Sequence, residues 1–283
     1  MVRPLLVVAL SVAFLFAPVE PIGAMSQDSR RPAATAALQI SELQRRADAG
    51  DLDAEVVLGT LYEAGEGVAE NRALAAAWYL KAATAGHAGA QVNLASMYLD
   101  GEGVPRDPAA AVAWFRRAAE SGDTTAQLTL GTIFETGVET GAATGAVPVK
   151  RDAAQAASWY RKAAERGLMP AQTRLARMYE DGRGVGRNRD QAAAWYRKAA
   201  DQDDPAAQLA LGRLLAPGNG SRTDAVAAHM WLNLSASRWK DEALRVQAAG
   251  LRDALEKRMT PAQLSDATRR SLAWQDTVGM RRK

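Results

Sequence analysis

The sequence predicts an all-α protein, a solenoid of about five helix-pair units with a helical cap at each end. Three observations predict this fold class. A tryptophan recurs at separations of 36, 45, 36 and 36 residues, at Trp78, Trp114, Trp159, Trp195 and Trp231. The apolar residues between these tryptophans follow the helical period, and a glycine-rich loop divides each interval. A recurring unit of this length is typical of stacked repeats, in which each unit buries its apolar face against its neighbours.

The first helix of each unit opens on an alanine and carries one apolar stripe. A leucine follows the alanine by four residues, a small residue by five, and a further large apolar residue by eight. Offsets 0, 4 and 8 share one helix face, so this stripe is the expected core face. We expect the small residue to let a neighbouring helix approach closely. The opening residues are Ala54, Ala90, Ala126, Ala171 and Ala207.

The second helix of each unit has its own start and stop signals. Seven residues before each tryptophan stands an Asn or Asp, a residue type that caps helices by accepting a bond from a free backbone N–H. These caps are Asn71, Asp107, Asp152, Asn188 and Asp224. Eight residues after the first three tryptophans stands a glycine, suited to a left-handed helix end, while Asp203 takes this place in the fourth unit and suits it less. We expect the tryptophans and the aromatic residues beside them to lie in the core.

These positions combine into the pattern A-Q-x-x-L-G-x-x-Y-x-x-G-x-G-V-x-x-[ND]-x-x-x-A-x-x-W-Y-x-K-A-A-x-x-G. The pattern resembles the Sel-one-like repeat (SLR), a relative of the tetratricopeptide repeat. Its five copies cover residues 54–89, 90–125, 126–170, 171–206 and 207–237. The resemblance implies a right-handed α/α solenoid that acts as a scaffold or adaptor for protein–protein interaction, and bacterial members are often exported.

Two copies depart from the pattern. The third carries nine extra residues at 138–146, and Pro148 replaces its second loop glycine. The fifth has Ser221 for the loop valine and Leu215 for the tyrosine, as a terminal repeat can. The insertion is either a binding loop or a tolerated surface insertion. We favour the second interpretation, because added loop length costs little entropy.

The N-terminal region predicts export. Residues 1–24 combine a charged start at Arg3, an apolar run from Leu5 to Ala17 and a small residue, Ala24, at a cleavage site. The run is too short to span a bilayer as a helix, and an uncleaved anchor is the alternative. Residues 25–36 predict a linker, and residues 37–53 a capping helix. We therefore expect a periplasmic or secreted protein with no transmembrane segment in its mature form.

Beyond Trp231 the repeat ends, and residues 238–275 predict two capping helices followed by a basic tail at 276–283. The first helix, from Asp241 to Met259, carries a stripe at Leu244, Ala248, Leu251, Leu255 and Met259. The second opens on a capping box, Thr260 with Gln263, and is expected to end near Trp274.

Charge is concentrated at the C-terminus. Residues 238–283 hold 11 basic and 6 acidic groups, against 24 and 26 in the rest of the chain. Such an end suits an acidic partner, for instance a cell-envelope polysaccharide, and solvated helix faces are the simpler interpretation. We expect no nucleic acid partner, because aromatic and basic residues are not interleaved here.

The sequence lacks the parts of most catalytic sites. There is no cysteine, and neither His87 nor His229 has a second histidine at ligand spacing, so we expect no metal and no cofactor. A Ser-His-Asp set is not excluded, because its members need not be adjacent. The Gly-x-Gly loops follow helices rather than strands, which favours turns over phosphate cradles. We predict that the protein is not an enzyme. A hydrolase is the alternative, since some cysteine-rich relatives are associated with β-lactam hydrolysis, although their paired cysteines are missing here.

One face of each first helix is not needed for packing against other helices. Offsets 3, 6 and 10 from the opening alanine share this face, away from the core stripe. By resemblance to tetratricopeptide arrays it lines a concave groove. The hypothesis is that this groove takes a protein or peptide partner whose acidic residue meets the arginines, and a solvated polar face with no partner is the simpler interpretation. The expected groove residues are Asn93, Ser96, Asp100, Thr129, Thr132, Thr136, Arg174, Arg177, Asp181 and Arg213.

The sequence thus predicts a non-enzymatic interaction scaffold or adaptor that serves as a regulator or an assembly factor. A cell-wall or polysaccharide-associated protein is the second interpretation, and it depends on the basic C-terminus.

Overall fold

A computed structural model describes residues 31–140, 146–218 and 223–281 of the chain. This part of the chain consists of helices joined by loops, with one isolated antiparallel bridge between Val138 and Val149. The helices are α1 Arg31–Asp48, α2 Leu52–Ala64, α3 Arg72–Thr84, α4 Ala88–Asp100, α5 Pro108–Glu120, α6 Thr124–Thr136, α7 Ala153–Glu165, α8 Met169–Asp181, α9 Arg189–Ala200, α10 Pro205–Leu215, α11 Ala225–Arg238, α12 Glu242–Glu256 and α13 Pro261–Arg281.

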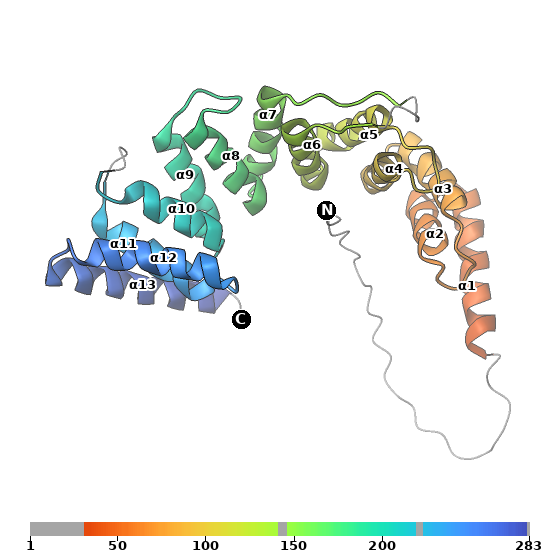
Figure 1. Cartoon of the computed structure of the whole chain (residues 1–283). Coiled ribbons are helices and arrows are strands. Elements are labelled where there is room, and N and C mark those ends of the chain that lie inside the picture. The colour runs from red at the N-terminus through yellow and green to blue at the C-terminus, as the bar shows by residue number, and fades with distance from the viewer. Residues whose placement is uncertain (1–30, 141–145, 219–222, 282–283) are drawn as a thin grey trace, which may run out of the picture.

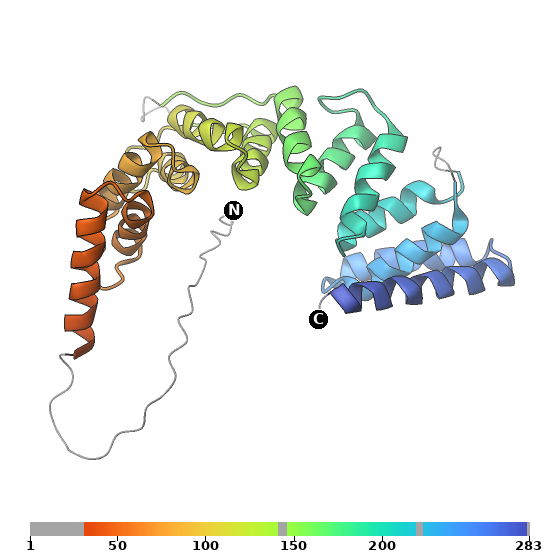
Figure 2. The same ribbon diagram turned by 180° about the vertical axis from the view of Figure 1, so that it is seen from behind.

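Helices α2 to α11 form five consecutive pairs, and each helix packs against the next along the chain. Figures 1 and 2 show the result, an arch with α1 at one end and α12 and α13 at the other. The predicted all-α solenoid is confirmed. Because each helix contacts mainly its neighbours in sequence, the stability of such an array is close to a sum of unit and interface terms.

The predicted caps start the second helices. The side chains of Asn71, Asp107, Asp152, Asn188 and Asp224 each accept a hydrogen bond from a backbone N–H in the first turn of α3, α5, α7, α9 and α11. After α9 the backbone of Asp203 is left-handed, with φ 69°. Its carboxylate accepts bonds from Arg238 Nε at 2.8 Å and from Gln208 Nε2 at 3.3 Å, which offsets the strain of a non-glycine residue there.

The core differs from the prediction at the tryptophans. The residue after each tryptophan is fully enclosed: Tyr79, Phe115, Tyr160, Tyr196 and Leu232 are at most 2% exposed. Trp159 and Trp231 are buried as predicted, at 7% and 2% exposed, but Trp78, Trp114 and Trp195 are only half-buried. A cation three residues further along lies over the indole of the first four tryptophans, at 3.9–5.2 Å from the ring centroid. The long side chain of this Lys or Arg covers the ring that the helices leave open.

The small residue of the first helix has the expected role. A Cβ added at Gly59 would lie 2.5 Å from the ring of Tyr79, and one added at Gly131 would lie 2.4 Å from that of Tyr160. The buried aromatic ring therefore packs directly on the backbone of the first helix.

A glutamine that the sequence analysis did not single out joins successive units. Its side-chain amide donates to a carbonyl at the end of the preceding second helix, at 2.9–3.3 Å. The donors are Gln91, Gln127, Gln172 and Gln208. In the first unit Glu55 stands at this place, and Lys81 instead bridges Glu55 Oε1 and the carbonyl of Ala47 in α1, at 2.9 Å each.

The ends of the array extend further than predicted. Helix α1 begins at Arg31, so residues 31–36 of the expected linker are helical. Helix α13 does not end near Trp274 but continues to Arg281, so residues 276–281 of the expected basic tail are helical. Trp274 packs edge-on against Trp231 of α11, with 5.8 Å between ring centroids. Leu251 of the predicted α12 stripe is 37% exposed, whereas Ala248 and Leu255 are buried. The signal segment 1–24 lies outside the described residues.

Candidate functional site

The structure places the predicted groove residues on the first helices of the second to fifth units. They lie on α4 (Asn93, Ser96, Asp100), α6 (Thr129, Thr132, Thr136), α8 (Arg174, Arg177, Asp181) and α10 (Arg213). Asn93, Ser96, Thr129 and Thr132 are half-buried, and the other six side chains are exposed.

Three tyrosine hydroxyls lie beside the first helices that carry the predicted groove residues, although the sequence predicts only a core role for these tyrosines. The rings of Tyr79, Tyr160 and Tyr196 are buried, and their hydroxyls emerge beside the first helix of the same unit. Each hydroxyl donates to Oε2 of a glutamate nine residues after the opening alanine. The pairs are Tyr79–Glu63 at 2.7 Å, Tyr160–Glu135 at 2.7 Å and Tyr196–Glu180 at 3.0 Å.

The sequence does contain a signal for these pairs. The second unit has Phe115 in place of the tyrosine, and there the glutamate is replaced by Leu99. The fifth unit has Leu232 with Ala216. Hydroxyl and carboxylate therefore occur together or not at all, as expected for two groups that satisfy each other in a half-buried position.

Each hydroxyl also meets other polar groups of the groove. Thr60 Oγ1 lies 3.2 Å from the Tyr79 hydroxyl oxygen, and Thr132 Oγ1 lies 3.3 Å from that of Tyr160. Burial is the main cause that raises the pKa of Tyr79, Tyr160 and Tyr196, and the neighbouring carboxylate acts in the same direction. The three hydroxyls consequently stay protonated and act as hydrogen-bond donors at neutral pH.

Two of the groove arginines are already paired within the chain. Arg174 lies 3.0 Å from Glu135, and Arg213 lies 2.6 Å from Glu180, so each arginine neutralises the glutamate of the preceding unit. Arg183 adds a second cation to Glu135 at 3.3 Å. Burial opposes ionisation of Glu135, but the Tyr160 hydrogen bond and the two arginines outweigh it, and the pKa of Glu135 lies below its usual value.

These ion pairs revise the expected arginine cluster. Arg174 and Arg213 are only about half-exposed, and each is already paired with a carboxylate of this chain, Glu135 or Glu180. Neither guanidinium group is therefore unpaired and available for an acidic residue of a partner. Arg177 differs: over the described residues it forms no ion pair with a carboxylate, and it reaches the Tyr196 hydroxyl. Of the three arginines, Arg177 is therefore the one best placed to meet an acidic group.

The predicted groove residues on α4 and α6 are neutral or acidic. Ser96, Thr132 and Thr136 donate to backbone carbonyls within their own helices, which leaves their oxygens as acceptors. Burial and the charge of Glu102 raise the pKa of Asp100, against the effect of Arg106.

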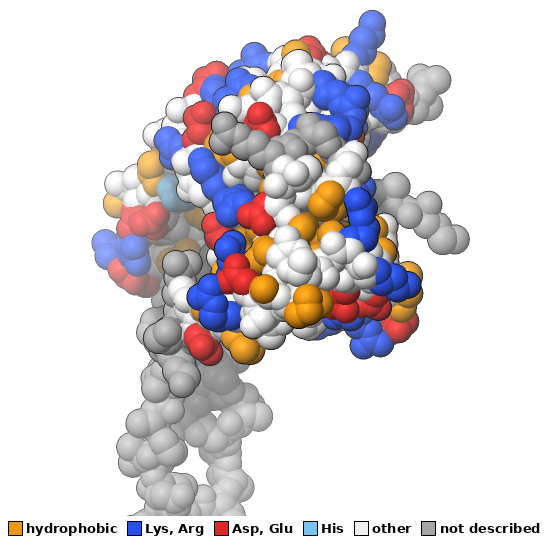
Figure 3. Space-filling model, turned by 90° about the vertical axis from the view of Figure 1, so that its left-hand side faces the viewer, with side chains coloured by type: hydrophobic (Ala, Val, Ile, Leu, Met, Phe, Trp, Pro, Cys, Tyr) orange, Lys and Arg blue, Asp and Glu red, His pale blue; other side chains and the backbone are white. Residues whose placement is uncertain are grey.

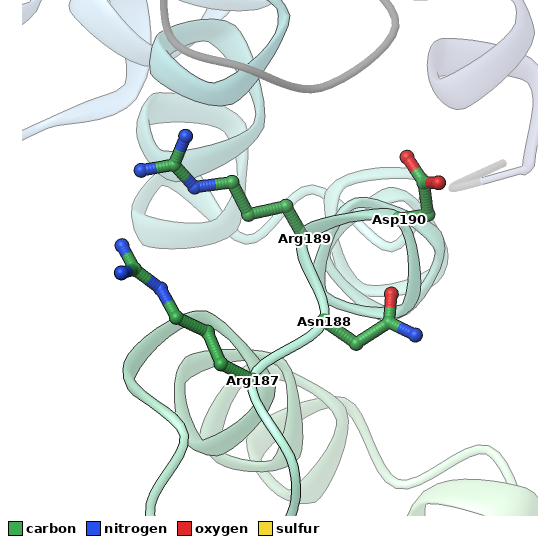
Figure 4. Close-up of a pocket in the computed structure, with 4 residues that line it drawn as sticks. All are labelled: Arg187, Asn188, Arg189 and Asp190. Atoms are coloured by element: carbon green, nitrogen blue, oxygen red, sulfur yellow. The ribbon is translucent and has the colours of Figure 1, made fainter.

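Figure 4 shows an open hollow at the α8–α9 loop, where the guanidinium groups of Arg187 and Arg189 point to the same side. Asn188 and Asp190 complete its lining. Arg187 Nε donates to the carbonyl of Glu180 at 3.1 Å, and Asn188 caps α9. Arg106 makes the equivalent bond to Leu99 at 2.9 Å. Two of its four lining residues, Arg187 and Asn188, therefore hold the loop and the start of α9 in place.

The two histidines have structural contacts. Nδ1 of His87 caps α4, and its Nε2 lies 3.1 Å from Asp53. His229 is 5% exposed and joins α11 to Glu256 of α12 at 2.8 Å. Over the residues that the structure covers, no three His, Asp or Glu side chains are grouped closely enough to hold a metal ion.

Within the described ranges, no helix has both the length and the hydropathy that crossing a bilayer requires.

The insertion of the third unit is tied to the second unit. Val138 and Val149 pair at its base, and Arg106 Nη1 donates to the carbonyl of Glu139 at 3.0 Å. Residues 141–145 lie outside the described part of the chain.

Basic groups at the C-terminal end are interspersed with acidic ones. Figure 3 views this end and shows blue and red side chains mixed, with hydrophobic side chains between them. Arg238 pairs with Asp203, Arg252 with Asp253 and Glu256, and Arg269 and Arg270 with Asp266. These pairs favour the interpretation of solvated helix faces over a patch built for an acidic polymer.

Five stacked helix pairs with a polar face clear of the core define a helical-repeat scaffold. The chain belongs to the Sel1 repeat family, whose model matches residues 52–87, 88–123, 126–168, 170–204 and 205–238. Members of this family generally mediate protein–protein interactions, and the fold is typically a non-catalytic scaffold.

Solved structures resemble the chain to different degrees. A Sel1 repeat protein from Oxalobacter formigenes is 34% identical, with a TM-score of 0.60, and the match covers 74% of this chain and 58% of that one. A protective antigen present in uropathogenic Escherichia coli strains, which displays an SLR fold, is 26% identical over 84% of this chain and 63% of its own, with a TM-score of 0.43. An immunity protein from Pseudomonas aeruginosa is 20% identical over 80% of each chain, with a TM-score of 0.36. None of the curated proteins compared with the chain is a significant match.

Proposed function

We propose that this protein is an exported, non-enzymatic scaffold that holds a segment of a partner protein along the face formed by α4, α6, α8 and α10. The observation that carries the proposal is this face itself, where polar side chains stand clear of the core in four successive units. Its tyrosine hydroxyls and carboxylates are held in place by buried rings and by ion pairs between units. A preorganised polar surface of this kind lowers the entropic cost of binding.

The contribution of Arg177 can be tested by charge reversal. Arg177→Glu is expected to weaken binding of a captured partner about five- to tenfold, because it reverses the field where an acidic partner residue would lie. The partner is first captured from an envelope or culture fraction on the immobilised protein, and binding is then titrated. Helical content and melting temperature should stay unchanged.

Arg116→Glu is the matched control. It makes the same charge change on an exposed position of the second helix α5, away from the face. Equal affinities for the Arg177→Glu variant and the unaltered protein, with both correctly folded, would remove Arg177 from the binding site.

The proposed location in the periplasm or outside the cell rests on residues 1–24. Cleavage is expected after Ala24, where the apolar run is followed by small residues. N-terminal sequencing of the exported protein should begin at Met25. A full-length chain retained in the membrane fraction would contradict export in this form.

A further inference from the structure

The three tyrosine-bound glutamates of the groove do not have the same electrostatic surroundings. Glu135 is neutralised by Arg174 and Arg183, and Glu180 by Arg213. Glu63, in the first unit, accepts from the Tyr79 hydroxyl at 2.7 Å in the same way, yet no cation pairs with it over the described residues. Of the three, Glu63 is the carboxylate without a counter-charge.

The chain itself explains this difference through its repeat register. Arg174 stands three residues after the opening alanine of its unit, and Arg213 stands six residues after that of the next. The residues at the same two offsets in the second unit are Asn93 and Ser96. Asn93 reaches the Tyr79 hydroxyl, and the Ser96 hydroxyl donates to the carbonyl of Val92. Both are neutral, so neither supplies the missing charge.

The fourth unit shows how such a carboxylate divides its two oxygens. Tyr196 donates to Oε2 of Glu180, and Arg213 binds Oε1 of the same group. Tyr79 likewise donates to Oε2 of Glu63. In the third unit Arg183 also takes Oε1 of Glu135, while Arg174 shares Oε2 with Tyr160. The oxygen of Glu63 that Tyr79 leaves for a guanidinium or ammonium group is Oε1.

We propose that Glu63 is a subsite for a lysine or arginine side chain of the bound partner segment. The partner supplies the cation that Arg213 supplies to Glu180 within the chain. Glu63 is half-buried and hydrogen-bonded, so it presents a fixed charge at which a charge-assisted bond is stronger than on a fully solvated carboxylate.

The proposal rests on the proposed function and adds a direction to it. Glu63, the acceptor for a basic residue, lies on α2 in the first unit, and Arg177 lies on α8 in the fourth unit, three units further along the array. Between them, the second unit offers Leu99 and Phe115 in place of a charged pair. A bound segment is thus oriented with a basic residue toward the N-terminal end of the array and an acidic one toward the C-terminal end.

Peptide display on the purified protein tests this assignment. Binders are selected from a random linear peptide library, and individual peptides are then titrated against the unaltered protein and its variants. Selected peptides should be enriched in Lys or Arg at one position. Glu63→Gln, which keeps the hydrogen-bond acceptor and removes the charge, should weaken these peptides about fivefold or more.

Ser96→Arg provides a second, independent variant. It places an arginine where the fifth unit has Arg213, so the chain neutralises Glu63 from within. The affinity for basic peptides should fall as it does for Glu63→Gln, and the melting temperature should rise. The rise in melting temperature should disappear when Ser96→Arg is combined with Glu63→Gln, because the introduced arginine then has no carboxylate at position 63 to pair with.

Glu120→Gln, an exposed position on α5, is the control for loss of one negative charge, and it should leave affinities unchanged. Peptides that bind equally well to folded Glu63→Gln and to the unaltered protein would overturn the subsite. If Arg177→Glu still weakens those peptides, the groove function stands without it. A library that yields no binders, or binders indifferent to both variants, would count against both proposals.

Discussion

Tyr160→Ala is expected to lower the free energy of unfolding by about 3–5 kcal/mol, the usual cost of emptying a buried aromatic site. Tyr160 is fully buried, and its ring lies against the backbone of α6 at Gly131. The substitution also removes the hydrogen bond that holds Glu135 in the groove. Because Tyr160 lies in the third of five units, its loss weakens the centre of the array.

The comparison with Trp195→Ala makes this prediction specific. From the sequence alone Trp195 is an equally strong core residue, but its ring is half-buried and covered by Lys198 at 4.0 Å. We expect a loss of only about 1–2 kcal/mol for Trp195→Ala. Urea unfolding followed by circular dichroism measures both variants. A larger loss for Trp195→Ala than for Tyr160→Ala would show that the tryptophan is the true core anchor.

The second large effect is expected at Gly184. Its backbone is left-handed, with φ 68°, and an added Cβ would lie 2.0 Å from the carbonyl oxygen of Ala153 at the start of α7. Gly184→Ala therefore combines backbone strain with a clash against a neighbouring unit that cannot move independently. We expect a loss of about 2–4 kcal/mol in unfolding free energy.

Gly186→Ala is the matched control, two residues along the same loop. Its added Cβ would meet nothing within 4 Å, so the expected change is under about 0.5 kcal/mol. Gly167→Ala separates the two causes, because Gly167 has φ 91° but open space around it. Thermal melts of the three variants should rank Gly184 as the most damaging and Gly186 as the least. Equal melting temperatures for all three would refute the close contact between units.

Gly184 shows what loop spacing indicates and what it leaves open. The sequence predicts a turn that needs left-handed geometry, and the structure bears this out. The close approach of Gly184 to Ala153 of α7 joins two neighbouring units, and the two residues are 31 positions apart in the sequence. Gly103 approaches Arg72 in the same way. Local patterns report local conformation, and such contacts depend on how successive units stack.

For the groove face too, the sequence predicts one part and only the tertiary structure shows the other. The face carrying Asn93, Thr129, Arg174 and Arg213 was predicted from helical offsets, because a helix places every third and fourth residue on one side whatever surrounds it. The pairing of Arg174 with Glu135 and of Arg213 with Glu180 was not predicted, and it changes how the arginines are interpreted.

The repeat, its caps and its free face follow from the amino-acid sequence, because helix periodicity and capping depend on residues within one or two turns. The tertiary structure alone shows that Tyr79, Tyr160 and Tyr196 are enclosed while Trp78, Trp114 and Trp195 are only half-buried, and that the three tyrosine hydroxyls bind glutamates of the first helices. It also shows that, among the residues the structure describes, no arginine pairs with Glu63 as Arg174 pairs with Glu135 and Arg213 with Glu180. The reason is physical: burial and charge pairing are set by distances between helices, and those distances exist only once the units have stacked.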